Sequence, residues 1–379
     1  MQKTLWTDNI WYEGDKAWFV SGELNALFEL DENEHDCKCV GKIPNTDFSE
    51  RRQNSNCIKA GENIFCFPYG GKEIWVYDLR LKEFYQIEID NPLGISLQIY
   101  DFWLQSDTIY AVSMGLKQVV EIDIVKKEIV KYYKIVEDEN ERLSFGEKVG
   151  ESIFCCSVTK NRIYELNVST GNVTYHEFPK INTNISRICF DGSKFWLSGK
   201  NKAIYIWDKK ENVITELNDF PQKFGVYDFL NKRENVLDCT INEYEDATFF
   251  KMVSSEKYVW LIPFRTNYVL YVDKETYEVK YLDITEEVEN RNTLKAVDRA
   301  LNHKFLVLYY RNKKMIGLYS LKNNNILEID TESVMWKYKE FDAKKAIAKL
   351  FLECSKLQEV LTENTFCDLE CLVEILKSN

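Results

Sequence analysis

Four carboxylates stand where they could work as a catalytic pair. Each lies on or beside a short apolar segment that we expect to form an inner β-strand: Asp8, Asp101, Glu147 and Asp298. Two carboxyl groups at a suitable separation can act as acid and base, or as acid and nucleophile, in glycoside cleavage. Acids that merely face water need no such role, and sequence spacing does not fix the distances between these four. A carbohydrate-active enzyme of the hydrolase or lyase type is therefore an alternative hypothesis.

Histidine and cofactor signatures are scarce. The chain has three histidines, and we place His35, His176 and His303 in an outer turn, an outer strand and a strand-connecting turn. Nucleophilic triads need a histidine beside the nucleophile, and histidine-ligated metals need several together. The sequence contains no phosphate-binding glycine motif and no CxxC pair. These features predict no metal and no cofactor, and they favour a non-catalytic protein.

A repeated pattern must position the charged residues. In its clearest copy, a polar turn at 61–63 precedes the apolar segment 64–68, a tight turn precedes 73–77, and a third segment covers 84–89. Most copies start about 40 to 47 residues apart, the period of propeller blades. The apolar runs are typical of strands buried between neighbouring sheets. Seven copies occupy approximately residues 8–43, 55–90, 99–135, 145–178, 186–218, 248–284 and 295–331.

A short polar residue ends the third strand of every copy. Such a side chain accepts hydrogen bonds from the backbone of the turn that follows, so we expect these residues to be structural. They are Asp31, Asp78, Asp123, Asn167, Asp208, Asp273 and Ser320.

Two of the copies resemble known repeats. Gly70-Gly71 followed by Tyr77-Asp78 resembles a kelch repeat, and Ile206-Trp207-Asp208 resembles the third strand of a WD40 blade. The segment 18–31 is also similar to uncharacterised bacterial propeller proteins. Across about residues 8–331 the chain therefore resembles the β-propeller repeat superfamily. This resemblance implies an all-β, seven-bladed β-propeller and implies no particular activity.

Two segments interrupt or follow the repeats. We expect a propeller domain over 1–334, with an insertion at 219–247, and a short α-helical appendage over 335–379. An apolar stripe at helical spacing in the appendage includes Ile347, Phe351 and Leu357. Such a stripe is usually buried against its own domain. The alternative is that it docks the chain into a multiprotein complex.

Cations mark the turns between second and third strands. In a propeller these hairpins share one face with the links between blades, and six of the seven tips carry Lys or Arg. A positive field there favours a protein partner or an anionic or carbohydrate ligand. The candidate binding residues are Lys72, Lys117, Lys160, Lys200, Lys202, Arg265 and Arg311 on the tips, and Arg51, Arg52 and Arg187 near the links.

Composition limits the remaining classes. The net charge of −12 argues against nucleic-acid binding, which needs a basic surface. Neither an apolar run long enough to cross a membrane nor a secretory signal is recognisable, and the irregular cysteines are typical of reduced thiols. We therefore expect a cytoplasmic protein, and the Lys-, Asn- and Ile-rich composition favours a bacterial source. The function we predict is a non-catalytic binding or scaffolding propeller.

Overall fold

The fold is all-β throughout the residues that can be described. The computed structural model describes residues 9–13, 16–22, 25–31, 36–46, 53–201, 203–221, 248–255, 257–263, 269–282, 297–298, 305–310 and 315–320. These ranges contain twenty-seven strands and no helix. The strands form sheets in which sequential strands are neighbours. The predicted all-β class is confirmed for this part of the chain, whereas the insertion after residue 221 and the predicted C-terminal helices lie outside it.

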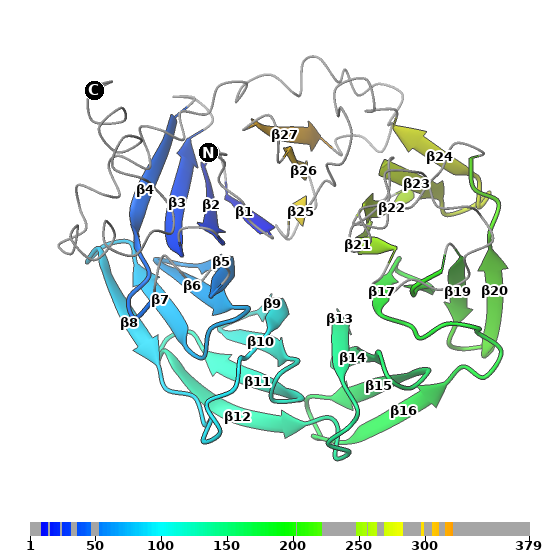
Figure 1. Ribbon diagram of the computed structural model, residues 1–379, viewed down its shortest axis with the longest axis horizontal. Coiled ribbons are helices and arrows are strands. Elements are labelled where there is room, and N and C mark those ends of the chain that lie inside the picture. Colours follow the sequence, from blue (N-terminus) through cyan, green and yellow to red (C-terminus); the bar gives the residue numbers. More distant parts are fainter. Residues whose placement is uncertain are drawn as a thin grey trace, which may run out of the picture. The chain divides into compact units, whose positions relative to one another are not determined.

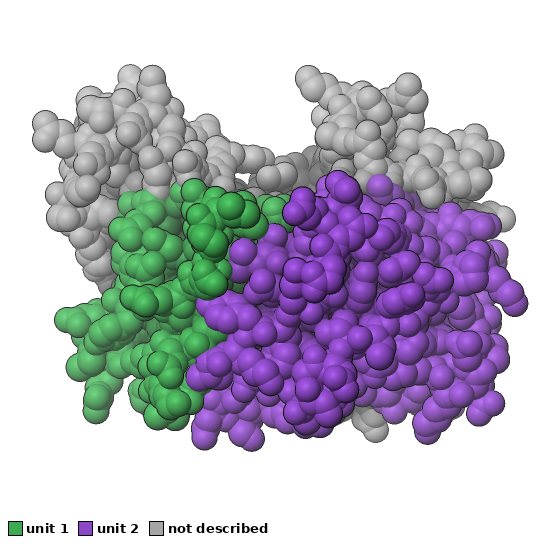
Figure 2. Space-filling model, turned by 90° about the horizontal axis from the view of Figure 1, so that it is seen from below, with its two compact units in different colours: residues 1–99, 123–129, 296–379 green, residues 100–122, 130–295 purple. Residues whose placement is uncertain are grey.

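The first compact unit comprises residues 1–99, 123–129 and 296–379 and is green in Figure 2. Its first sheet is extended by β25, which pairs in parallel with β1 through Asn9 and Val297. The bounds in this sheet are β1 (Asn9–Glu13), β2 (Lys16–Ser21), β3 (Ala26–Asp31), β4 (Asp36–Lys42) and β25 (Val297–Asp298). The second sheet contains β5 (Asn54–Ala60), β6 (Asn63–Pro68), β7 (Ile74–Asp78) and β8 (Glu83–Ile87), and a separate hairpin contains β26 (Phe305–Tyr310) and β27 (Met315–Ser320).

The second compact unit comprises residues 100–122 and 130–295 and is purple in Figure 2. It holds four-stranded sheets whose first strands lie innermost and whose fourth strands lie outermost (Figure 1). The first two contain β9 (Ile99–Gln105), β10 (Thr108–Ser113), β11 (Gln118–Asp123) and β12 (Glu128–Lys134), then β13 (Leu143–Val149), β14 (Ser152–Ser157), β15 (Arg162–Asn167) and β16 (Val173–Glu177). The next two contain β17 (Arg187–Phe190), β18 (Phe195–Ser198), β19 (Ile204–Asp208) and β20 (Val213–Leu217), then β21 (Phe249–Ser254), β22 (Tyr258–Pro263), β23 (Val269–Asp273) and β24 (Val279–Leu282).

Consecutive sheets of the second unit pack face to face. One apolar cluster joins Phe154 and Ile163 of one sheet to Phe195 and Trp207 of the next. Another joins Trp196 to strands β21–β23 of the following sheet. The middle strands bury both faces in this arrangement. This explains why they appear in the sequence as continuous apolar runs rather than alternating ones.

Five of the seven polar residues predicted at the ends of third strands close the following turns, and the side chains of the other two, Asp31 and Ser320, lie outside the described part of the chain. Asp78 Oδ1 accepts hydrogen bonds from the backbone N–H groups of Arg80 and Leu81 at 3.0 and 2.9 Å. The bonds to the Leu81 and Arg80 N–H groups and to Lys127 outweigh the effect of burial, so the pKa of Asp78 is lowered. Equivalent bonds are made by Asp123, Asn167, Asp208 and Asp273.

Tyr133 on β12 supports a test of the packing between sheets. Its hydroxyl lies 2.6 Å from Glu121 Oε2 and 3.0 Å from the Val168 carbonyl oxygen. Burial, together with Glu121, raises its pKa well above the ordinary value. Tyr133→Phe should lower the free energy of unfolding by about 1 to 2 kcal/mol, because the hydroxyl proton shared by Glu121 and the buried Val168 carbonyl oxygen is lost. Denaturant titration measures the change. Tyr175→Phe on β16, where the residue is 54% exposed, is the control and should change stability by less than about 0.5 kcal/mol.

Candidate functional site

The structure brings together two of the four candidate carboxylates. Asp101 on β9 and Glu147 on β13 interact electrostatically in the second unit. Asp298 belongs to β25, whose backbone pairs with β1 opposite Ile10. Asp8 lies outside the described residues.

Asp101 forms an ion pair that links first strands far apart in the sequence. Its Oδ1 lies 3.0 Å from Nζ of Lys251 on β21, and its Oδ2 accepts a 2.9 Å hydrogen bond from the Gly146 N–H. The side chain of Asp101 is only 1% exposed and that of Lys251 is 18% exposed. Charges so well removed from water are stable only when paired. The pair therefore ties β9 and β13 to β21.

Glu147 lies beside this pair and has an unusual proton affinity. Burial raises its pKa to about 7, Lys251 opposes that shift, and the negative charge of Asp101 adds to it. A carboxyl group that titrates near neutrality is the property expected of a general acid or base. The deep burial of Asp101 also limits access from solvent. The cluster thus has the electrostatics of a catalytic site, with Asp101 fully buried and Glu147 partly buried.

Three aromatic rings from residues adjacent in sequence to Asp101, Gly146 and Lys251 pack against one another. The Tyr100 and Phe145 centroids are 5.0 Å apart, and Phe250 meets them edge-on at 6.2 and 5.9 Å. Arg187 of β17 stacks on Phe145 at 3.9 Å and donates a 2.6 Å hydrogen bond to the Phe250 carbonyl oxygen. All three rings are at most 8% exposed. Arg187 therefore stabilises the contact of inner strands and takes part in this cluster.

Bulges in the inner strands produce this arrangement. The register shifts by one residue between Leu143 and Gly146 on β13, and again between Phe249 and Lys251 on β21. A bulge turns side chains away from the alternation of a regular strand. Phe145 and Phe250 lie within these bulges. The sequence predicted Asp101 and Glu147 as candidates but missed Lys251, although a single charge in the apolar run of β21 was a visible signal.

Two of the predicted tip cations bind to the neighbouring link between β12 and β13. Lys160 Nζ lies 2.8 Å from Asp138 Oδ2 and 3.1 Å from Glu141 Oε2. Lys117 Nζ donates to the Asp138 carbonyl oxygen at 3.1 Å and to that of Glu139. Both lysines therefore fasten the link between β12 and β13. The charge of Lys160 is offset by two carboxylates, whereas the described contacts of Lys117 are neutral carbonyl oxygens that do not cancel its charge.

The remaining tip residues have different surroundings. Lys72 is exposed at the β6–β7 hairpin, and Lys200 lies in the β18–β19 connection, where its backbone N–H donates to Thr183. Five further candidates lie outside the described residues, so their role stays a prediction: Lys202, Arg265, Arg311, Arg51 and Arg52.

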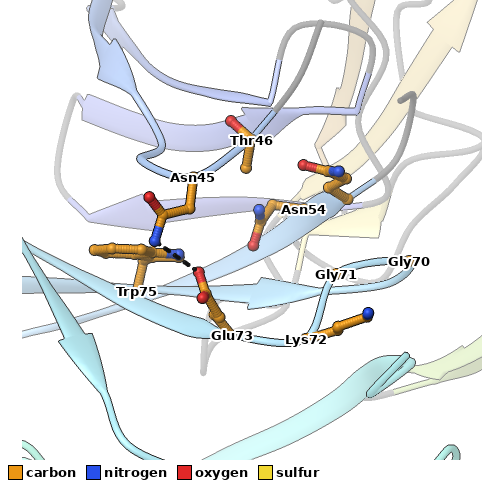
Figure 3. A pocket seen from close by; sticks show the side chains of 9 residues that line it. Asn45, Thr46, Asn54, Gly70, Gly71, Lys72, Glu73 and Trp75 are labelled. Atoms are coloured by element: carbon orange, nitrogen blue, oxygen red, sulfur yellow. Dashed lines mark hydrogen bonds between the residues drawn. The ribbon is translucent and has the colours of Figure 1, made fainter. Parts of the chain in front are cut away.

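A polar pocket lies in the first unit beside Lys72. It has a volume of about 210 Å³ and forms where the link after β4 meets the β6–β7 hairpin. Figure 3 shows Asn45, Glu73 and Trp75 on one side and Asn54, Gly71 and Lys72 on the other. Thr46, Gln53 and Gly70 complete the lining.

Gly71 allows the hairpin and the link to approach each other. Its N–H donates a 2.9 Å hydrogen bond to the Gln53 carbonyl oxygen. A Cβ atom on Gly71 would lie 2.8 Å from that same oxygen, so a larger residue would push the two segments apart. The double glycine of the sequence therefore shapes one wall of the pocket.

Other classes of site have little support in the described part of the chain. Within it, no group of three His, Cys, Asp or Glu side chains is placed to hold a metal ion. Nor do these residues include a helix with the length and apolarity of a membrane span. His176 packs against Trp207 at 4.8 Å and lies 2.7 Å from Glu165, which is a structural environment.

Comparisons with known proteins identify the fold. No protein-family profile matches the chain, and no curated protein sequence matches it. A streptogramin B lyase structure has a TM-score of 0.59 at 12% identity, covering 80% of this chain and 90% of the lyase. A chain in the mitotic checkpoint complex has a TM-score of 0.56 at 8% identity, covering 80% and 84%. The propeller domain of Myceliophteria thermophila Cps50 (Swd1) has a TM-score of 0.53 at 11% identity, covering 84% and 98%.

These similarities agree with the repeated sheets. Each full sheet has four sequential antiparallel strands, which is the construction of a propeller blade. At such low identity the similarity establishes architecture and leaves activity open. The chain is thus a β-propeller protein, with WD40 propellers among its structural neighbours.

Proposed function

We propose that this protein is a non-catalytic binding propeller that engages its partner or ligand through the face carrying the second-to-third hairpins. The polar pocket on that face, beside Lys72, is the observation that carries the proposal. It combines cationic, anionic and amide side chains in a concave site, which is typical of specific binding. The candidate carboxylate Asp101, by contrast, is paired with Lys251 and only 1% exposed.

We also propose that the propeller has seven blades. Besides the six full sheets, β26 and β27 form a hairpin and β25 pairs with β1. We infer that β25 to β27 belong to a seventh blade. Cys155 and Cys156 are buried without a disulfide, which supports the proposal of a cytoplasmic location, where thiols stay reduced.

Charge reversal tests the binding face. The triple variant Lys72→Glu, Lys200→Glu and Arg265→Glu should reduce captured partner by about tenfold or more, because opposed charges at an interface repel. Pull-down with the full chain and quantitative mass spectrometry measures the loss. Lys117 and Lys160 are left intact, because they hold the link between β12 and β13.

The matched control reverses lysines at third-to-fourth strand turns, which lie at the opposite ends of the strands. Lys82→Glu, Lys126→Glu and Lys210→Glu add the same charge there and should leave capture unchanged. Equal capture by both triple variants and the wild type would refute binding through the hairpin face.

An acid–base enzyme is the second candidate. One observation favours it, the pKa of about 7 for Glu147 beside Asp101 and Lys251. One of the similar structures is also named a lyase. If this candidate is right, the wild type cleaves at least one substrate in a panel of chromogenic glycosides and Glu147→Gln lowers the rate about a hundredfold or more. Equal rates for both proteins would eliminate it.

A further inference from the structure

The pocket beside Lys72 contains a buried polar atom without a partner. Asn54 at the start of β5 is 2% exposed, and its side-chain oxygen makes no hydrogen bond. A buried acceptor left unsatisfied destabilises the folded state. Because Asn54 lines the pocket, a bound molecule can supply the missing donor. This atom is therefore a binding feature that the fold itself leaves unused.

The other polar groups of the pocket include both hydrogen-bond donors and hydrogen-bond acceptors. Glu73 offers a carboxylate, and its only described partner is Asn45 Nδ2 at 3.5 Å, which is long for a hydrogen bond. Lys72 supplies an ammonium group, and the amides of Asn45 and Gln53 supply donors and acceptors. The charges of Lys72 and Glu73 cancel, so this site does not select an anion. A neutral ligand whose groups both donate and accept fits it better.

Hydroxyl groups have this dual character. A sugar presents several of them on a rigid ring, and adjacent hydroxyls match the paired oxygens of a carboxylate or the N and O of an amide. The volume of about 210 Å³ suits one sugar ring rather than a long chain. Trp75 adds an apolar edge next to the polar groups (Figure 3). A zwitterionic amino acid would also match the Lys72 ammonium and the Glu73 carboxylate, so a titration with glycine separates it from a saccharide.

We propose that this pocket binds a neutral saccharide unit, with Asn54 and Glu73 accepting hydrogen bonds from its hydroxyl groups and Lys72 donating to its oxygens. The assignment rests on the proposed binding function, because it names the ligand class for one site on the same face. The sequence predicted an anionic or carbohydrate ligand for this face. For this pocket, the proposal specifies a carbohydrate.

A glycan array followed by calorimetry tests the proposal. The full-length chain is applied to an array of mono- and oligosaccharides, and the best binder is titrated into the wild type and two variants. Asn54→Leu removes the buried acceptor, and Glu73→Gln removes the carboxylate while keeping the shape. Each should weaken binding about tenfold or more, as expected when a site loses a hydrogen bond to a ligand hydroxyl. Glycine and inorganic phosphate are titrated in parallel and should not bind.

Two matched controls accompany these variants. Asn63→Leu changes another asparagine of the same sheet whose side-chain oxygen lacks a partner but which does not line the pocket. Glu83→Gln changes an exposed carboxylate on β8. Both should bind the saccharide like the wild type. If Asn54→Leu fails to fold, Glu73→Gln alone decides the result.

The outcomes separate this inference from the binding function as a whole. No saccharide bound, or binding unaffected by Glu73→Gln, overturns the saccharide site. Selective binding of glycine or phosphate overturns it as well. If partner capture still depends on Lys72, Lys200 and Arg265 in either case, the binding face survives without the sugar pocket. If no saccharide binds and partner capture does not depend on these three residues, both proposals are overturned.

Discussion

Replacing Asp101 with leucine is expected to lower the free energy of unfolding by about 3 to 5 kcal/mol. The change leaves Lys251 without its partner at 3.0 Å and leaves the Gly146 N–H without its acceptor at 2.9 Å. The Lys251 side chain is only 18% exposed, so water replaces the lost carboxylate poorly. Guanidinium unfolding monitored by tryptophan fluorescence measures the difference.

A double-mutant cycle separates the ion pair from simple loss of packing. Asp101→Leu combined with Lys251→Met removes both charges and should recover most of the stability lost in the single variant, because no lysine is left buried without Asp101 and burial keeps the neighbouring Glu147 in its neutral form. Lys126→Met removes a lysine that is 61% exposed with only long contacts, and it should change stability by less than about 0.5 kcal/mol. A double variant as unstable as Asp101→Leu would show that the pairing does not stabilise the inner strands.

Glu147→Gln is expected to stabilise the protein at pH 8 and to have little effect near pH 4.5. The folded-state pKa of Glu147 is raised by burial to about 7, against an ordinary value of 4.5. The folded wild type therefore binds more protons than the unfolded chain between these values, so its stability falls as pH rises through this window. Above pH 7 the folded wild type carries the full cost of burying the ionised Glu147 carboxylate, on the order of 1 to 3 kcal/mol.

The measurement is the stability difference between Glu147→Gln and the wild type from pH 4.5 to pH 8. This difference isolates Glu147, because the other titrating groups are shared by both proteins. It should grow with pH and level off above about pH 7. Glu128→Gln, which alters a side chain that is 57% exposed, should differ from the wild type by less than about 0.5 kcal/mol throughout. A pH-independent difference for Glu147→Gln would mean that its carboxyl titrates alike in both states.

The repeated strands were predictable because their causes are local. The expected segments 64–68 and 73–77 correspond within a residue to Asn63–Pro68 and Ile74–Asp78. Asp78 closes its own turn through atoms two and three residues away, so sequence spacing alone specifies the contact. For the tip cations, the sequence did not predict the contacts that they make within the chain. The residues that bind Lys117 and Lys160 come from the link between β12 and β13, about 20 residues away in the sequence, and composition gave no sign of these contacts.

The amino-acid sequence by itself determined the four-stranded repeat, its turn chemistry and the candidates Asp101, Glu147 and Lys72. Only the tertiary structure decided that Asp101 meets Lys251 across 150 residues and that Asn54 opens into a pocket beside Lys72. The physical reason is the separation along the chain of the residues that interact. Hydrogen bonds within a turn depend on a few dihedral angles, whereas contacts between sheets depend on bulges and on the packing of many side chains.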